Sequence, residues 1–445
     1  MIVARTFVFF ASLLTFLLSF ASTGRADSAS LEAEVRKRAK AVENEIIVLR
    51  RDIHQYPELG DQETRTSKLV ANYLRNLKLE VRTGVARTGV VGILKGGKPG
   101  RTVALRADMD ALPVQEPAGL PFASKEMGNY HGKMVPVMHA CGHDTHTAML
   151  LAAAKVLAGM KDDLPGTVIF IFQPAEEGPS SFDPTSGRSW GAKLMLEEGL
   201  FNDTKPDAVF GLHVFPGRSG EIAYRSGATT ASSDNLEITV TGKQGHGGMP
   251  WNTVDSITTS ATIISGLQTV VSRKANLTES PLVVTIGTIN GGTAPNIVAE
   301  TVYMTGTVRA YDEKVREQTR RDIRLAVEKI AESAGAKATV SITKNYDTSI
   351  NDEKLTAQMA PVLKRAADGK VTTVPLVGAS EDFSCYARAT PGLFVFLGVT
   401  PHGQDPAKAA PNHSPDFFVD ESALVVGTRT MASLAVNFLS EAPKE

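Results

Sequence analysis

Residues 168–177 read Val-Ile-Phe-Ile-Phe-Gln-Pro-Ala-Glu-Glu, so that an apolar run passes directly into a polar segment. The same change occurs after residues 102–105, where Arg-Ala-Asp-Met-Asp follows, and after residues 209–212, where His213 follows. Short apolar runs of this kind, alternating with helical patterns, predict the buried strands of a mostly parallel sheet. Ligands of such sheets gather beyond the carboxyl ends of the strands, which is where these polar segments fall.

Helical patterns fill the intervals between these runs. Apolar residues recur at three- and four-residue spacing between 31 and 79, and further helices are expected at 144–158 and 192–198. Residues 393–397 add a late buried strand, after which His413 lies in a loop before a final helix. The expected fold class is therefore α/β, with a mostly parallel sheet covered by helices on both faces.

The pattern changes near residue 231. Leu236, Ile238 and Val240 alternate strictly with polar residues, which is typical of a sheet with one face in water. A helix from 254 to 271, strands near 282–289 and 301–309, a charged helix at 312–333 and a strand at 338–342 are expected next. This βαββαβ order is that of the ferredoxin-like unit. We therefore expect a main domain in two parts, 27–230 and 347–445, interrupted by an α+β domain at 231–346.

Composition excludes some classes of partner. A chain of 445 residues is too long to fold around a single hydrophobic core. It has 47 basic and 48 acidic residues, which give a net charge of −1, and neither sign forms long runs. Such a chain lacks the basic footprint of a nucleic-acid-binding protein or of a protein that binds anionic membranes. A small molecule or a short peptide is the expected substrate.

The first 26 residues form a class of their own. Arg5 precedes an almost wholly apolar run at 7–20, and Gly24-Arg25-Ala26 offers small residues for cleavage. The run is shorter than the roughly 20 residues of a membrane-spanning helix. We therefore expect a signal peptide at 1–26, an exported protein that is periplasmic or secreted, and no stable membrane insertion after cleavage. An uncleaved membrane anchor is the alternative.

Residues 138–146 read Met-His-Ala-Cys-Gly-His-Asp-Thr-His. Thiolate sulfur and neutral imidazole nitrogen are ligands that transition metals prefer, and Gly142 lets the backbone fold so that Cys141 and His143 converge. A nucleophilic Cys141 with a histidine base is the alternative chemistry. A disulfide between Cys141 and Cys385 is the structural alternative, but the setting between two histidines in a glycine turn favours a reduced thiol.

The remaining candidate ligands follow strands elsewhere in the chain: Glu176 and Glu177, His213, and His413. Taken singly, each also has an ordinary interpretation as a hydrogen-bonded structural histidine or a solvated glutamate pair. Their joint placement favours a metal site. Two adjacent glutamates also meet a chemical need, because one carboxylate can hold a metal while the other takes a proton from the activated water.

Seven ordered motifs carry a family resemblance. They are Arg51-Asp-Ile-His54 with Pro57-Glu-Leu59 and Thr64, the Arg-Ala-Asp-Met-Asp-Ala-Leu-Pro run at 106–113, Cys-Gly-His-Asp at 141–144, Gln173 to Gly178, Gly245 to Pro250, Ser380 to Phe383, and His413-Ser414. Together they resemble the amidohydrolase branch of the metallo-aminoacylase/carboxypeptidase family, which includes hippurate hydrolases and indole-acetyl-amino-acid hydrolases.

The resemblance implies hydrolysis of an amide between an acyl or aroyl group and an amino acid. It implies a catalytic main domain that holds two divalent metal ions, whether manganese, zinc, cobalt or nickel. Glu176 would be the general base, and the implied ligands are Cys141, His143, Glu177, His213 and His413.

The resemblance also implies that the inserted domain is a lid that dimerises, which gives a homodimer or a higher homo-oligomer. His246 would reach a neighbouring subunit's site and donate a hydrogen bond to the developing oxyanion. The alternative is that His246 only shapes its glycine-rich turn. Asn296 resembles the family's substrate-binding asparagine.

One departure concerns Asp108 and Asp110. The peptidase branches of the family carry a ligating histidine in this segment, so these aspartates are expected to support ligands or the fold rather than bind metal. Peptidase specificity is not carried over. The roles of His139 and His146 stay open, whereas His54, His131 and His402 are interpreted as structural or surface residues. A cysteine-nucleophile amidase and an exported, non-catalytic metal- or ligand-binding protein remain the alternative functions.

Overall fold

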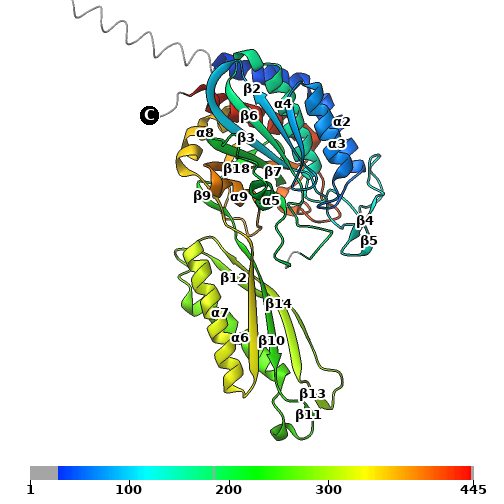
Figure 1. Ribbon diagram of the computed structural model, residues 1–445, viewed down its shortest axis with the longest axis vertical. Helices are drawn as coiled ribbons and strands as arrows, with labels where there is room; N and C mark the ends of the chain where they lie inside the picture. Colours follow the sequence, from blue (N-terminus) through cyan, green and yellow to red (C-terminus); the bar gives the residue numbers. More distant parts are fainter. Residues whose placement is uncertain (1–28, 184–185, 442–445) are drawn as a thin grey trace, which may run out of the picture. The chain divides into compact units, whose positions relative to one another are not determined.

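The computed structural model describes residues 29–183 and 186–441, so the signal peptide expected at 1–26 lies outside the described residues. The described chain forms two compact units (Figure 1). The first unit holds the described residues as far as Arg225, together with Asp352–Thr373 and the chain from Tyr386 onward. The second unit holds Ser226–Asn351 and Val374–Cys385.

The second unit thus contains a segment, Val374–Cys385, that lies outside the boundaries expected from periodicity. This segment is joined to the start of the insertion by backbone hydrogen bonds. The N–H of Ala231 is bonded to the carbonyl groups of Val377 and Ala379, each at 3.0 Å. Such a long-range pairing leaves no periodic signal in a short polar stretch.

The first unit contains an eight-stranded sheet within the described residues, in the order β1-β2-β6-β3-β7-β18-β8-β17. Its strands are β1 (Glu80–Val85), β2 (Gly89–Lys95), β6 (Pro165–Gln173), β3 (Lys98–Asp108), β7 (Ala208–Arg218), β18 (Gly392–Thr400), β8 (Ile222–Tyr224) and β17 (Val371–Thr373). The four neighbours β6, β3, β7 and β18 run parallel to one another. They contain the four apolar runs of the sequence, so the prediction of a mostly parallel sheet is confirmed.

Both faces of this sheet are buried. Phe170, Ile171 and Phe172 are consecutive in β6 and have no exposed surface, which requires cover on both sides because successive side chains point to opposite faces. The helices of this unit include α2 (Glu43–Gln55), α3 (Thr64–Asn76), α4 (His143–Ala158), α5 (Gly191–Glu197), α8 (Glu353–Ala366) and α10 (Leu424–Ser440). Along the chain, α9 (Phe383–Ala389) begins in the second unit and ends in the first. A β-hairpin of β4 (Met127–Tyr130) and β5 (Lys133–Pro136) projects from this unit (Figure 1).

Helix α10 with its preceding turn, Glu421–Ser440, is long and apolar enough to cross a membrane by composition. However, 83% of its apolar 18-residue stretch is buried inside the protein. Leu434, Ala435 and Val436 belong to the main hydrophobic core, where α10 contacts α4 and β3. The apolar character of α10 is therefore that of a core helix.

The second unit has the expected βαββαβ order. Its main elements are β10 (Ser233–Thr241), α6 (Ser256–Thr269), β12 (Leu282–Gly291), β14 (Thr301–Ala310), α7 (Glu313–Ser333) and β15 (Lys337–Tyr346). All pairs in the sheet are antiparallel, in the order β12-β14-β10-β15. Leu236, Ile238 and Val240 are fully buried beneath the helices, so the ferredoxin-like prediction is confirmed.

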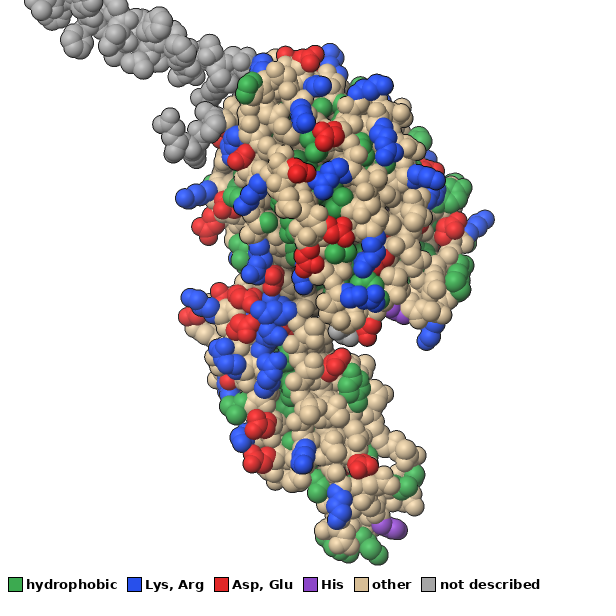
Figure 2. All heavy atoms as spheres, viewed as in Figure 1, with side chains coloured by type: hydrophobic (Ala, Val, Ile, Leu, Met, Phe, Trp, Pro, Cys, Tyr) green, Lys and Arg blue, Asp and Glu red, His purple; other side chains and the backbone are tan. Residues whose placement is uncertain are grey.

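The surface carries charges of both signs. On the face drawn in Figure 2, Lys and Arg side chains are interspersed with Asp and Glu side chains over the described residues. Cys141 and Cys385 are both free cysteines, which agrees with the expectation of a reduced Cys141.

Candidate metal centre

The parallel register brings the polar segments to one edge of the main sheet. Asp108 at the end of β3 pairs with Gln173 at the end of β6, and His213 in β7 lies beside Phe396 of β18. Helix α4 begins at His143. Residues far apart in sequence therefore meet where the strands end, as expected for a parallel sheet.

Gly142 makes the turn between Cys141 and His143 possible. Its φ is +99°, and a Cβ atom at this position would lie 2.3 Å from Cγ2 of Val214. Both the conformation and the space require glycine. The turn places Sγ of Cys141 3.3 Å from Nε2 of His213 and directs the first turn of α4 into the site.

The predicted ligands and Glu176 form one cluster. Their potential ligand atoms lie within 4.8 Å of one another in three overlapping groups. The groups are Cys141 with His143 and His213, Cys141 with Glu177 and His413, and His143 with Glu176 and Glu177. Sharing of Cys141, His143 and Glu177 between groups is the arrangement that two neighbouring cations need.

Two histidines are each held through one ring nitrogen. Nδ1 of His143 lies 3.2 Å from Oδ1 of Asp110, whereas its Nε2 is buried and has no hydrogen-bond partner in the described part of the chain. His213 donates from Nδ1 to the carbonyl group of Val214 at 2.7 Å. The lone pair on its Nε2 is therefore available to bind a metal ion. Metal-binding histidines are oriented in this way, by a carboxylate or a carbonyl group behind the ring.

His413 reaches the cluster from a loop. It has φ +70°, an uncommon conformation for a residue with a side chain. The loop is held there because the N–H of His413 donates to the carbonyl group of Ala140 at 2.8 Å, and Asn412 donates to that of Cys141 at 2.8 Å. Nε2 of His413 lies 2.8 Å from Oε1 of Glu177.

The cluster favours positive charge. Burial and the carboxylates of Glu177 and Glu176 raise the pKa of the Cys141 thiol well above its usual value. Burial lowers the pKa of His143, but the neighbouring Asp108 and Asp110 outweigh it and raise the pKa to about 10. Buried carboxylates, a thiol and an imidazole nitrogen without a partner form a donor set that fits divalent transition metals.

Asp108 and His146 support the cluster. Asp108 Oδ2 accepts a hydrogen bond from Arg106 at 2.6 Å, and Oδ1 accepts one from Nδ1 of His146 at 2.6 Å. Nε2 of His146 in turn accepts the N–H of Val214 at 2.8 Å. Both ring nitrogens of His146 are therefore occupied, so His146 fixes β7 beside His213 and is not itself a ligand. The sequence offered only its proximity to the Cys-His segment.

A second buried network lies behind the cluster. His54 lies 2.9 Å from both Asp144 Oδ2 and Glu116 Oε1, so it is an ion-paired core histidine. His139 is fully buried, and neither ring nitrogen has a hydrogen-bond partner among the described residues. Burial lowers the pKa of His139 to about 3, so its ring is neutral.

His246 and Asn296 belong to the second unit, where they are neighbours. His246 in β11 (Gly245–His246) pairs with Ile297 in β13 (Ile297–Val298), and Gly247 donates to the carbonyl group of Asn296 at 2.8 Å. Nδ1 of His246 accepts the N–H of Gly248 at 2.9 Å. This contact leaves Nε2–H of the exposed ring as a hydrogen-bond donor.

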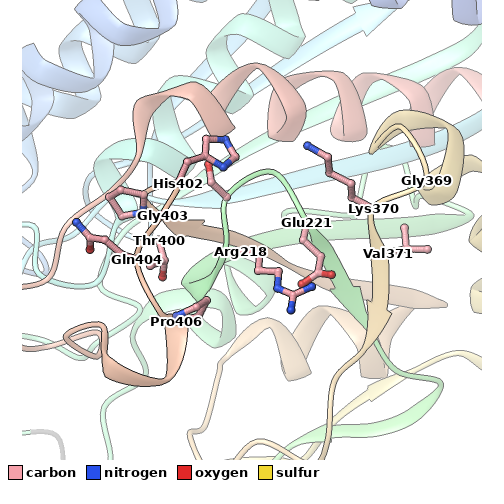
Figure 3. A pocket seen from close by; sticks show the side chains of 12 residues that line it. Arg218, Glu221, Gly369, Lys370, Val371, Thr400, His402, Gly403, Gln404 and Pro406 are labelled. Atoms are coloured by element: carbon pink, nitrogen blue, oxygen red, sulfur yellow. The ribbon is translucent and has the colours of Figure 1, made fainter.

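A cavity of about 620 Å³ in the first unit does not include the cluster. Figure 3 shows Arg218, Glu221, Lys370 and His402 around it. None of the predicted site residues lines this cavity, and His402 lies on its wall, in agreement with its interpretation as a surface residue.

The sequence profile of peptidase family M20/M25/M40 matches residues 104–437. The chain is 41% identical over 413 residues to "Thermostable carboxypeptidase 1" of Saccharolobus solfataricus, which covers 92% of this chain and 99% of that protein. It is 37% identical to "IAA-amino acid hydrolase ILR1-like 2" of Arabidopsis thaliana, over 96% of this chain and 94% of that protein.

A solved structure is also similar. The Bacillus subtilis YXEP protein, described as a dinuclear metal binding peptidase from the M20 family, matches with a TM-score of 0.73 and 34% identity. The match covers 90% of this chain and 99% of that chain.

Proposed function

Because the chain belongs to peptidase family M20/M25/M40, we propose that it is a metal-dependent hydrolase that cleaves the amide bond of N-acyl or N-aroyl amino acids. The observation that carries this proposal is the single cluster of Cys141, His143, Glu177, His213 and His413, with Glu176 beside it. The names of the Arabidopsis relative and of the Bacillus structure support the substrate class and the dinuclear site, respectively.

Two divalent cations would be held by Cys141, His143, Glu177, His213 and His413, whose potential ligand atoms form overlapping groups. When bound, such cations polarise a carbonyl group and lower the pKa of water. Asp110 and the carbonyl group of Val214 would keep Nε2 of His143 and of His213 directed at the metals. The preferred metal is manganese, zinc, cobalt or nickel, all of which accept nitrogen, oxygen and sulfur ligands.

Glu176 is the proposed general base. Glu177 is engaged by His413 at 2.8 Å, whereas Oε2 of Glu176 lies 4.0 Å from Nε2 of His143. A nearly buried carboxylate in this position can accept a proton from the attacking water and pass it to the leaving nitrogen. This transfer lets the amino acid leave as a neutral amine.

His246 is the proposed oxyanion donor, supplied by a second copy of the chain in a homodimer or higher homo-oligomer. Its Nε2–H is exposed and its Nδ1 is fixed by Gly248, so the ring presents a donor in a defined tautomer. Asn296, whose carbonyl group is bonded to Gly247, would contact the substrate next to it.

The test is a panel of acetyl, benzoyl and indole-acetyl amino acids, assayed on metal-stripped and metal-reconstituted protein with metal content measured in parallel. Hydrolysis that disappears on chelation and returns with a divalent cation is the expected result. Two metals per chain without hydrolysis of any member would favour the non-catalytic binding protein.

The panel should include short peptides. The 41% identity to a protein named a carboxypeptidase favours them as a second substrate class. The chemistry is closely related, because a peptide with a free C-terminal residue is itself an N-acyl amino acid. Relative kcat/KM values decide between the two classes.

A cysteine-nucleophile amidase is the remaining alternative, and the 3.3 Å contact between Cys141 and His213 is its one support. Burial and neighbouring carboxylates raise the pKa of this thiol, which opposes a free thiolate. We expect Cys141→Ser to lose metal and activity together. An acyl group trapped on Cys141 would instead establish the nucleophile.

We also propose export through the segment at 1–26, followed by cleavage. N-terminal sequencing of protein secreted by a host cell, with a variant that lacks residues 1–26 as the control, tests this. Retention of Met1 in the mature protein would contradict it.

A further inference from the structure

The glutamate pair sits on a strained turn. After β6 ends at Gln173, Ala175 has φ +50°, and Gly178 closes the turn by donating to the carbonyl group of Ala175 at 3.3 Å. A left-handed conformation is unfavourable for a residue with a Cβ atom, so surrounding contacts must hold it. The turn presents Glu176 and Glu177 together at the sheet edge.

One contact that holds the turn comes from Glu63, immediately before α3. Oε1 of Glu63 accepts the N–H of Ala175 at 2.8 Å, and Oε2 accepts the hydroxyl hydrogen of Thr88 at 2.6 Å. Glu63 and Ala175 have no exposed surface. A glutamate is rarely buried to this extent without a cation partner, because desolvation of its carboxyl group is costly.

Two further contacts fit the turn to its surroundings. Gly60 lies against it so closely that a Cβ atom there would be 2.2 Å from the carbonyl oxygen of Gly178. On the other side, Oδ2 of Asp110 accepts the N–H of Glu177 at 2.9 Å. Glu63 and Asp110 thus bind the N–H groups on either side of Glu176.

We propose that Glu63 is a positioning residue for amide hydrolysis, which acts by holding the Ala175 turn so that Glu176 and Glu177 face the metals side by side. This inference rests on the proposed function for its catalytic consequence. It concerns a residue that does not touch the metal ligands themselves. Removing the side chain of Glu63 should therefore lower kcat and metal affinity. Replacing Glu63 by a residue of the same shape that still accepts the hydrogen bond should leave both nearly unchanged.

The test compares Glu63→Gln with Glu63→Ala in the full-length, metal-loaded protein. The glutamine keeps a carbonyl oxygen for the N–H of Ala175, so kcat is expected to stay within about threefold of wild type. The alanine removes the acceptor, and kcat is expected to fall roughly 10- to 100-fold with little change in KM. Thr88→Val is the matched control, because it removes the hydrogen bond from Thr88 to Glu63 and should lower the Tm without lowering kcat.

A second-site variant separates positioning from general stability. Glycine adopts φ +50° without strain, so Ala175→Gly in the Glu63→Ala background should restore kcat by roughly fivefold. Wild-type kcat in Glu63→Ala would overturn the proposal. So would equal damage in Glu63→Gln and Glu63→Ala without rescue by Ala175→Gly.

Metal titration provides a readout that does not depend on turnover. Glu63→Ala should weaken binding of a divalent cation by about tenfold, while Glu63→Gln should not. If the wild-type protein hydrolyses no acyl amino acid, the proposed function fails, and the titration still decides the role of Glu63. Equal metal affinity in all three proteins would overturn that role.

Discussion

Asp110 contacts two of the predicted metal ligands: its Oδ1 lies 3.2 Å from Nδ1 of His143, and its Oδ2 accepts the N–H of Glu177 at 2.9 Å. A carboxylate behind a histidine fixes which ring nitrogen carries the proton and makes the other a stronger ligand. The same side chain therefore sets the direction of one ligand and the backbone position of another.

Asp110→Asn is expected to weaken metal binding by about 10- to 100-fold, because the amide supports His143 less strongly and can accept the N–H of Glu177 with only one oxygen. Competition with a chromogenic chelator measures the affinity. Asp52→Asn is the control, since the half-exposed Asp52 pairs with Arg65 at the surface. Equal affinity in Asp110→Asn and wild type would contradict the role of Asp110.

Glu176→Gln and Glu177→Gln are expected to separate proton transfer from metal binding. Glu176→Gln should keep the metals and lose about 10²- to 10⁴-fold in kcat, since an amide cannot accept the proton. Glu177→Gln should lose metal as well, because the neutral amide binds cations weakly. Metal content and kcat, measured on the same preparations of each variant, test both expectations. A Glu176→Gln enzyme with wild-type activity would show that Glu176 is not the general base.

Gly142→Ala is expected to destabilise the protein and disrupt the metal centre. Its Cβ atom would meet Val214 at 2.3 Å in a backbone conformation with φ +99°. Gly132→Ala is the control for conformation alone, because Gly132 has φ +83° and open space around it. Thermal unfolding should show a loss of about 1–3 kcal/mol beyond the control. Equal Tm values in both variants would contradict this expectation, because they would mean that β7 shifts to make room for the Cβ atom.

His54 should make stability depend on pH. Burial lowers its pKa, but ion pairs with Asp144 and Glu116 outweigh burial and Arg50, and the folded-state pKa is raised. The stabilisation by protonated His54 should be complete below its unfolded pKa of about 6.5 and decline as pH rises through the folded value. The difference in Tm between wild type and His54→Gln, measured on metal-stripped proteins, should therefore shrink as the pH rises through the folded-state pKa of His54. A difference independent of pH would show that His54 is neutral in the fold.

Local pattern was sufficient for much of the fold. The apolar runs at 102–105, 168–172, 209–212 and 393–397 became the four parallel strands at the centre of the sheet, because only fully buried strands tolerate such continuous apolar character. Pattern did not reveal the short strands β8 and β17 or the segment Val374–Cys385. These depend on long-range backbone pairing, which leaves little trace in the side chains.

For the site, the sequence by itself determined which side chains carry metal-binding chemistry, and that their strands end at a common edge. Cys141, His143, the pair Glu176-Glu177, His213 and His413 could be named because thiol, imidazole and carboxylate groups follow buried strands and a glycine turn. The family resemblance then assigned Glu177 as a ligand and Glu176 as the base. Only the tertiary structure decided which neighbours hold them. The sequence indicated a supporting role for Asp110 and left that of His146 open, but nothing in it marked Glu63. Their partners lie far apart in the chain, so only folding brings Glu63 to Ala175, Asp110 to His143 and Glu177, and His146 to Asp108 and Val214, within about 3 Å.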